Sequence, residues 1–68
     1  MRETKKKILT FIAAYIEEHG YSPTYREIME GVGLYSSSTV SRHVTDLREK
    51  GYITFEEARP RTIRIMKV

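Results

Sequence analysis

The sequence has no cysteine and no tryptophan, and it has only two prolines and four glycines among 68 residues. Without cysteine there is neither a disulfide framework nor a thiolate cage for a metal ion, which excludes the usual small secreted scaffolds. No apolar run approaches the roughly 18 residues of a membrane-spanning helix. The basic N-terminus is followed by too mixed a stretch for a signal peptide. We therefore expect a cytoplasmic protein with no membrane partner.

Length and charge narrow the range of functions further. Sixty-eight residues suffice for a single small domain, residues 1–68, and are too few for a two-domain enzyme. The net charge of +3 is unevenly distributed, because residues 1–7 carry +3 and residues 58–68 carry +4, while the middle is neutral to acidic. If the fold brings both ends to one face, they attract phosphates. The alternative is that these charges only keep the surface hydrated.

Hydrophobic spacing predicts two helices in the first half of the chain. The first has Thr4 as its expected N-cap, a core-facing apolar stripe, and Gly20 at its end. Thr24 and Glu27 then form a capping box, in which each side chain satisfies a backbone N–H at the start of a helix. This second helix is short, because glycines at positions 31 and 33 break it.

A third helix and a hairpin are predicted for the second half. The serines at 36–38 supply an N-cap, Val40, Val44 and Leu47 line one face, and Gly51 ends the helix. From residue 52 the apolar period becomes two, which indicates two strands whose inward side chains are Ile53, Phe55, Ile63 and Ile65. The expected fold class is α+β, with three helices and a C-terminal β-hairpin.

A short helix, a turn and a longer helix are the outline of a helix-turn-helix. With its apolar face turned inward, the third helix leaves polar side chains exposed over its first two turns: Ser38, Thr39, Ser41, Arg42 and Thr45. Arginine can donate to guanine O6 and N7, and hydroxyl groups bind base edges or phosphates. No acidic residue lies between positions 31 and 45 to repel a DNA backbone. The alternative is an ordinary solvated helix face.

The hairpin supports the same interpretation. Arg59, Arg61 and Arg64 lie at or beside its tip and form a basic wing that can reach phosphates or a minor groove. These arginines would equally protect an exposed strand edge against aggregation. Glu56 and Glu57 beside the tip argue against a purely electrostatic contact.

Four segments of the chain share residues and spacing with a known family. They are Gly20-Tyr-Ser-Pro-Thr-Tyr-Arg-Glu-Ile28, Val32-Gly-Leu-Tyr-Ser-Ser-Ser-Thr-Val40, Lys50-Gly-Tyr-Ile53 and Arg59-Pro-Arg-Thr-Ile-Arg-Ile65. Together they resemble the N-terminal winged helix-turn-helix of the LexA SOS repressors. The resemblance implies a recognition helix at about 37–50 in the major groove and a wing at about 56–62 on the backbone or minor groove. It also implies base-reading positions at Ser36, Ser38, Thr39, Ser41 and Arg42, and a wing contact around Arg59 to Arg61.

This sequence differs from the LexA family in one respect. LexA proteins continue into a domain that dimerises and cleaves its own linker, and nothing in this sequence corresponds to it. We therefore expect either a piece of a longer repressor or a free-standing relative. The predicted partner is double-stranded DNA at a two-fold operator, bound without a cofactor by a chain that is monomeric in solution and pairs, if at all, on DNA.

Two other functions compete with this interpretation. His43, Asp46 and the serine run do not make a catalytic triad, because the first two lie three residues apart on one solvated helix and so small a domain offers no deep cleft. We do not expect an enzyme. A winged helix that binds protein is the second alternative, with exposed aromatic anchors at Tyr15, Tyr21, Tyr25 and Tyr35.

Overall fold

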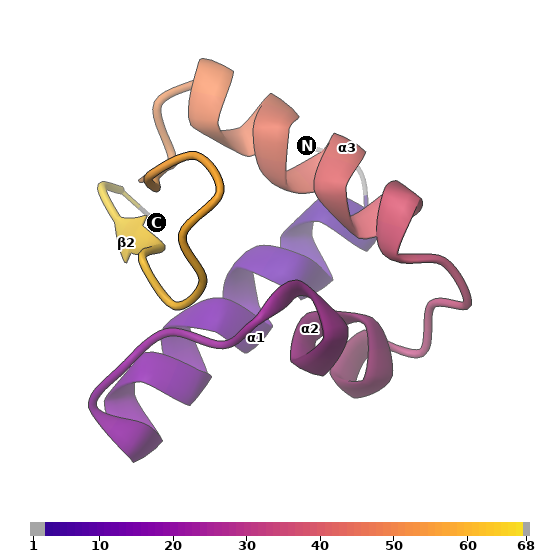
Figure 1. Ribbon diagram of the computed structural model, residues 1–68, viewed down its shortest axis with the longest axis horizontal. Coiled ribbons are helices and arrows are strands. Elements are labelled where there is room, and N and C mark those ends of the chain that lie inside the picture. The colour runs from indigo at the N-terminus through magenta and orange to yellow at the C-terminus, as the bar shows by residue number, and fades with distance from the viewer. Residues whose placement is uncertain (1–2, 68) are drawn as a thin grey trace.

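The computed structural model describes residues 3–67, in which three helices precede a two-stranded antiparallel sheet (Figure 1). The helices are α1 (Glu3–His19), α2 (Tyr25–Val32) and α3 (Ser37–Glu49), and the strands are β1 (Ile53–Thr54) and β2 (Arg64–Ile65). In Figure 1, α1 lies behind α2 and α3, and the loop between the strands stands beside them. The predicted order of elements is confirmed. Within residues 3–67, none of the helices is both long and apolar enough to cross a membrane.

The core lies where the three helices meet the hairpin. Every element contributes to it except the short β2, and each core side chain is at most 5 % exposed. Burying a branched aliphatic side chain contributes about 1.5–3 kcal/mol, so each member of this cluster stabilises the fold substantially. Its members are Ile8, Leu9, Ile12, Ile28, Val40, Val44, Leu47, Ile53 and Ile63.

The start of α1 differs from the sequence prediction, while its end agrees. The helix already includes Glu3, so Thr4 lies within its first turn and is not the N-cap. Gly20 follows the helix with a φ of 82°, and its N–H donates to the carbonyl of Ile16 at 2.8 Å. A left-handed backbone at this position favours glycine, which has no Cβ to clash.

The capping box of α2 forms as the sequence predicts. The Thr24 N–H donates to Glu27 Oε1 at 2.8 Å, and the Glu27 N–H donates to Thr24 Oγ1 at 3.2 Å. The prediction that Gly31 breaks the helix is wrong, because α2 continues through it to Val32. Gly31 is instead a packing residue, since a Cβ there would overlap the ring of Phe11 on α1. Gly33, with a φ of 79°, provides the left-handed C-cap.

The third helix carries the predicted apolar face, with Val40, Val44 and Leu47 fully buried. Ser36 occupies the N-cap position with an extended backbone, but its side chain makes no capping hydrogen bond. The helix ends at Glu49 and Lys50 is its C-cap, so the boundary is one residue earlier than predicted. Gly51 follows in the left-handed region, with a φ of 85°.

The hairpin is shorter than predicted but presents the predicted face. Ile53 pairs with Ile65, and Thr54 pairs with Arg64. Phe55 and Ile63 lie beyond the ladder, because residues 55–63 form the wing, a loop with its own hydrogen bonds. Ile53 and Ile63 are buried, and Phe55 and Ile65 pack against the core. The predicted α+β winged arrangement is therefore confirmed.

Candidate nucleic-acid interface

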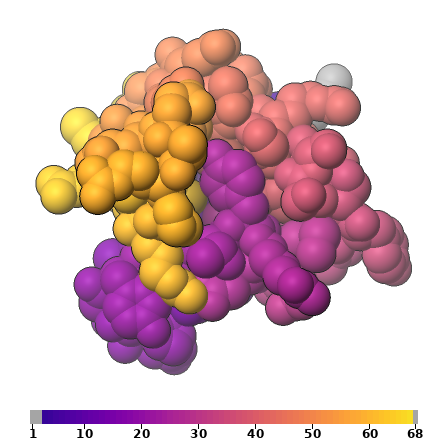
Figure 2. Space-filling view, viewed as in Figure 1, coloured from indigo at the N-terminus to yellow at the C-terminus, as the bar shows by residue number. Residues whose placement is uncertain are grey.

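A groove of about 440 Å³ lies where α3, the start of α2 and the wing come together. Ser41 and Thr45 of α3 line it, as do Arg59 and Arg61 of the wing. Figure 2 shows the wing, the start of α2 and α3 next to one another on one face of the molecule. Part of the predicted reading surface, Ser41 and Thr45, thus borders the same hollow as the wing, while Ser36, Ser38, Thr39 and Arg42 do not line it.

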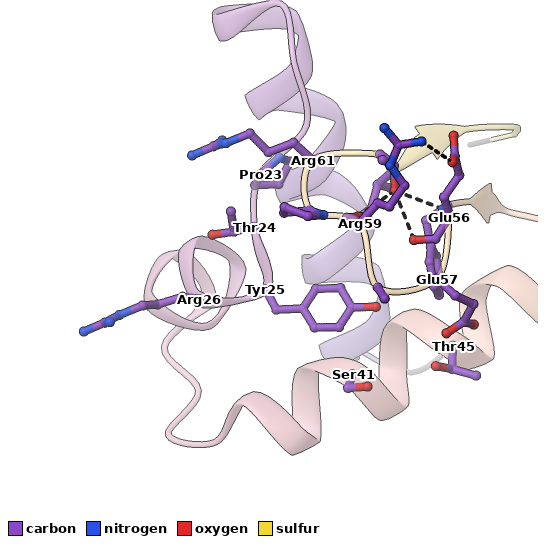
Figure 3. Close-up of a pocket in the computed structure, with 15 residues that line it drawn as sticks. Pro23, Thr24, Tyr25, Arg26, Ser41, Thr45, Glu56, Glu57, Arg59 and Arg61 are labelled. Atoms are coloured by element: carbon purple, nitrogen blue, oxygen red, sulfur yellow. Dashed lines mark hydrogen bonds and ion pairs between the residues drawn. The ribbon is translucent and has the colours of Figure 1, made fainter.

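The predicted reading residues, on α3 and at its N-cap, are at the surface. Ser36, Ser38 and Arg42 are exposed, and Thr39, Ser41 and Thr45 are half-buried. Ser38, Arg42 and Thr45 follow the spacing of a single helical stripe, and Ser41 and Thr45 stand one turn apart on the side of the groove (Figure 3). Hydroxyls and one guanidinium along a helix of this length match the size and chemistry of base edges in a major groove.

The wing is organised by Thr62, whose side chain replaces part of the strand ladder. Its Oγ1 accepts from the Glu56 N–H at 2.9 Å and lies 3.0 Å from the Arg59 carbonyl, to which the hydroxyl donates. Ala58 and Arg61 both have a φ of 59°, in the left-handed region. A side chain in that region costs about 1–2 kcal/mol, so the wing holds its shape through specific contacts rather than backbone preference.

The two acidic residues of the wing are each paired with an arginine. Glu56 lies 3.2 Å from Arg59, and Glu57 lies 2.8 Å from Arg48 on α3. The Arg59–Glu56 pair is exposed at both ends, with side chains 71 % and 64 % accessible, so it is weak and water or a phosphate can replace it. Arg59 is thus a cation at the wing surface that remains available to a polyanion.

Arg61 is held differently from Arg59. Its Nη1 and Nη2 each donate to a different oxygen of the Glu27 carboxylate, both at 3.0 Å. Nη1 also lies 3.1 Å from the carbonyl of Ser22, and the guanidinium is 4.9 Å from the centre of the Tyr21 ring. The pKa of Glu27 falls to about 2, mainly because Arg61 donates to it and also because of the Thr24 N–H. The assignment of Arg61 as a phosphate contact stays a prediction.

Among the residues that the structure describes, the basic side chains of α1 and those of the wing line different hollows. Lys6 and Lys7 of α1 border a separate depression beside the end of α2, whereas the wing arginines border the groove. Lys5 lies 3.1 Å from Asp46 of α3, an ion pair that joins the two helices. The basic side chains that line the groove therefore come from the wing, as Arg59 and Arg61, and from α2, as Arg26.

Two residues of α2 line the groove that the sequence analysis did not assign to the interface. Arg26 is 83 % exposed and pairs only loosely with Glu30, at 3.6 Å. The ring of Tyr25 projects from the start of α2 towards the wing (Figure 3) and packs edge-on against Phe55, with centroids 6.4 Å apart. Burial raises the pKa of Tyr25, and the nearby Glu57 carboxylate raises it further. The sequence does contain a signal for Arg26, because it follows the N-cap Thr24 and therefore lies in the first turn of the predicted helix.

The four tyrosines that could anchor a protein partner differ in their exposure and in the residues they pack against. Tyr35, in the turn before α3, is fully exposed, and Tyr21 is about half exposed. Tyr15 packs against His19, with ring centroids 4.1 Å apart and the rings tilted by 36°, while Tyr25 packs in the groove. Among the described residues, histidine and carboxylate side chains do not gather in groups of three that could hold a metal ion.

Three helices, a two-stranded hairpin and a groove between the third helix and the hairpin loop define a winged helix-turn-helix. Residues 1–62 match the family model of the LexA DNA binding domain. The chain belongs to this family.

Two curated relatives are similar to this chain over most of its length. The LexA repressor of Carboxydothermus hydrogenoformans is 47 % identical over 62 residues, which cover 91 % of this chain and 30 % of that protein. The LexA repressor of Bacillus mycoides is 46 % identical over 66 residues, covering 97 % of this chain and 32 % of that protein. The chain thus spans about a third of the length of these curated relatives.

Proposed function

We propose that this chain is a sequence-specific binding domain for double-stranded DNA and belongs to a LexA-like transcriptional repressor. The observation that carries the proposal is the shared groove, in which Ser41 and Thr45 of α3 face the wing that bears Arg59. A duplex that receives α3 in its major groove then meets the wing at the adjacent backbone or minor groove. The relatives are repressors by name, and the domain acts here by occupying a promoter, without a cofactor and without catalysis.

The reading residues divide by chemistry. Arg42 is exposed and can donate two hydrogen bonds to guanine, while the hydroxyls of Ser36, Ser38, Ser41 and Thr45 bind base edges or phosphates. The methyl group of Thr39 can contact a thymine methyl. Arg59 of the wing and Arg26 of α2 supply charge to phosphates on either side of the groove.

One copy of so small a domain makes few contacts, so its affinity for a single site is low. Two copies on a two-fold-related site supply the affinity that repression requires, with a half-site spacing set by what holds them together. We propose that this chain by itself is a monomer in solution and pairs on DNA. Sedimentation that shows a tight dimer at micromolar concentration contradicts this part of the proposal.

Selection of bound duplexes from a random pool tests the proposal directly. We expect a short enriched half-site, repeated as an inverted pair, and binding that weakens steeply with salt, with a log–log slope of about −0.9 for each neutralised phosphate. An aromatic contact with a protein partner would change little with salt. Failure to enrich any sequence, together with salt-insensitive binding to a protein, would overturn the proposal.

A further inference from the structure

Arg61 and Glu27 connect the wing to the start of the helix-turn-helix, and we call this pair the clasp. The two hydrogen bonds from the guanidinium to the carboxylate are parallel and both 3.0 Å long. Such a two-pronged contact is the strongest geometry available to an arginine and a carboxylate. Because the two residues lie 34 positions apart in the sequence, the clasp is a tertiary contact.

Other groups hold both members of the clasp in place. Glu27 Oε1 also accepts the N–H of Thr24 in the capping box, so the carboxylate is fixed to the first turn of α2. The Arg61 guanidinium donates to the carbonyl of Ser22 at 3.1 Å and lies over the ring of Tyr21. Arg61 is therefore bound to the segment that leads into α2 as well as to the helix itself.

The backbone of Arg61 points to the same role. Its φ of 59° is a conformation that a side-chain-bearing residue keeps only where its surroundings hold it. Arg59, two positions earlier, offers a contrast, because its side chain donates to Glu56 in the same exposed loop. In Figure 3 the side chain of Arg61 leads away from Ser41 and Thr45.

We propose that Arg61 is a positioning residue that holds the wing against α2, so that the wing and α3 meet one duplex, and that it is not a phosphate contact. The inference rests on the proposed DNA-binding function and deepens it. It changes the role that the sequence suggested for Arg61 and leaves Arg59 as the wing cation that reaches the backbone.

The two possible roles of Arg61, phosphate contact and positioning residue, predict opposite effects on DNA binding when Glu27 is replaced. If Arg61 bound a phosphate, removal of the competing negative charge in Glu27→Gln would free the arginine and strengthen DNA binding. If Arg61 positions the wing, the same change loosens the wing and weakens binding. Glutamine is a suitable replacement because it still satisfies the capping box of α2.

The experiment measures duplex affinity across a salt series for Glu27→Gln, Arg61→Met, Arg61→Lys and the double variant Glu27→Gln/Arg61→Met, with Arg59→Met as the matched control. The probe is the duplex selected from the random pool. We expect Glu27→Gln and Arg61→Met each to weaken binding roughly tenfold, about the effect of one lost charge-assisted hydrogen bond. The double variant should be no weaker than either single one, because both break the same contact.

The salt slope and the lysine variant separate positioning from charge. Arg59→Met should reduce the slope by about one, whereas Arg61→Met should leave it unchanged. Arg61→Lys keeps the charge but loses the two-pronged contact, so it should bind as weakly as Arg61→Met. Tighter binding by Glu27→Gln, or a slope for Arg61→Met that falls as it does for Arg59→Met, would overturn the inference.

Hydrogen exchange at the wing tests the clasp without DNA. The N–H of Ile63 donates to the buried Ser22 Oγ at 3.2 Å, next to the clasp. Its exchange should accelerate in Glu27→Gln and Arg61→Met and stay at the wild-type rate in Arg59→Met. If the wild-type chain selects no duplex, the proposed function fails while this measurement still decides the clasp. Unchanged exchange in all variants would overturn the clasp alone.

Discussion

The guanidinium of Arg48, near the end of α3, lies 2.8 Å from the carboxylate of Glu57 in the wing and 4.1 Å from the centre of the Phe55 ring. This contact gives the wing a second attachment, to the recognition helix, in addition to the attachment of Arg61 to α2. The charge of Glu57 is unfavourable for DNA binding by itself, but the guanidinium of Arg48 balances it. The wing is thus attached to both helices of the helix-turn-helix.

Replacement of Arg42 tests whether α3 reads bases. Arg42→Ala should cost about 1–3 kcal/mol on the selected duplex and relax the preference at one base pair. Arg64→Ala is the matched control, since it removes the same charge from an exposed position of β2 that lies outside the predicted reading helix. Affinities for a panel of duplexes with single base changes give the result. An equal loss for every duplex in the panel would contradict base reading by Arg42.

The same substitution at two adjacent positions of α3, Val44 and Thr45, should distinguish loss of stability from loss of DNA binding. Val44 is fully buried, so Val44→Asp places an unpaired charge in the core and should unfold a domain with a reserve of about 5 kcal/mol. Thr45 is half-buried in the groove, so Thr45→Asp should remain folded but lose DNA binding through repulsion of phosphates. Circular dichroism and a duplex-binding assay check the pair. A folded Val44→Asp chain would show that the core is assigned incorrectly.

Stability should decrease in acid because of Glu27. The folded-state pKa of its carboxyl is about 2, compared with an ordinary value of 4.5. A lowered pKa stabilises the fold fully above pH 4.5, and this contribution is lost as the pH falls from 4.5 towards 2. Thermal unfolding at several pH values should show a smaller decrease for Glu27→Gln than for wild type. Lys5 and Lys50 also lower the pKa of Asp46. Part of the loss of stability in acid should therefore remain in both proteins.

The side chain of Ser22 should contribute more to the free energy of unfolding than the side chains of the exposed serines on α3. It is only 3 % exposed, and its hydroxyl oxygen accepts the buried N–H of Ile63. Ser22→Ala leaves that donor without its acceptor, which should cost about 1–3 kcal/mol of unfolding free energy. Ser37→Ala, at an exposed position, is the control and should be nearly neutral. Urea denaturation measures both, and equal midpoints would show that the Ser22 bond contributes nothing.

Local sequence patterns were sufficient to predict the helices and the face each one buries. The capping box of Thr24 and Glu27 forms within four residues of chain, and the apolar spacing of α3 follows from helical geometry, so neither depends on distant segments. Such features hold in any fold that keeps the helices. The same reasoning placed Ser41, Thr45 and Arg42 at the surface of α3.

Contacts between distant segments decided the rest. Gly31 lies inside α2, where the ring of Phe11 on α1 occupies the space that a side chain would need. Local rules for glycine do not include such a contact. Arg59 and Arg61 look alike in the sequence, yet Arg61 meets Glu27 of α2 while Arg59 pairs with Glu56 inside the wing. Local chemistry therefore determined which residues form helices and carry charge. The tertiary structure decided which of those charges are already paired, since pairing depends on distances across the fold.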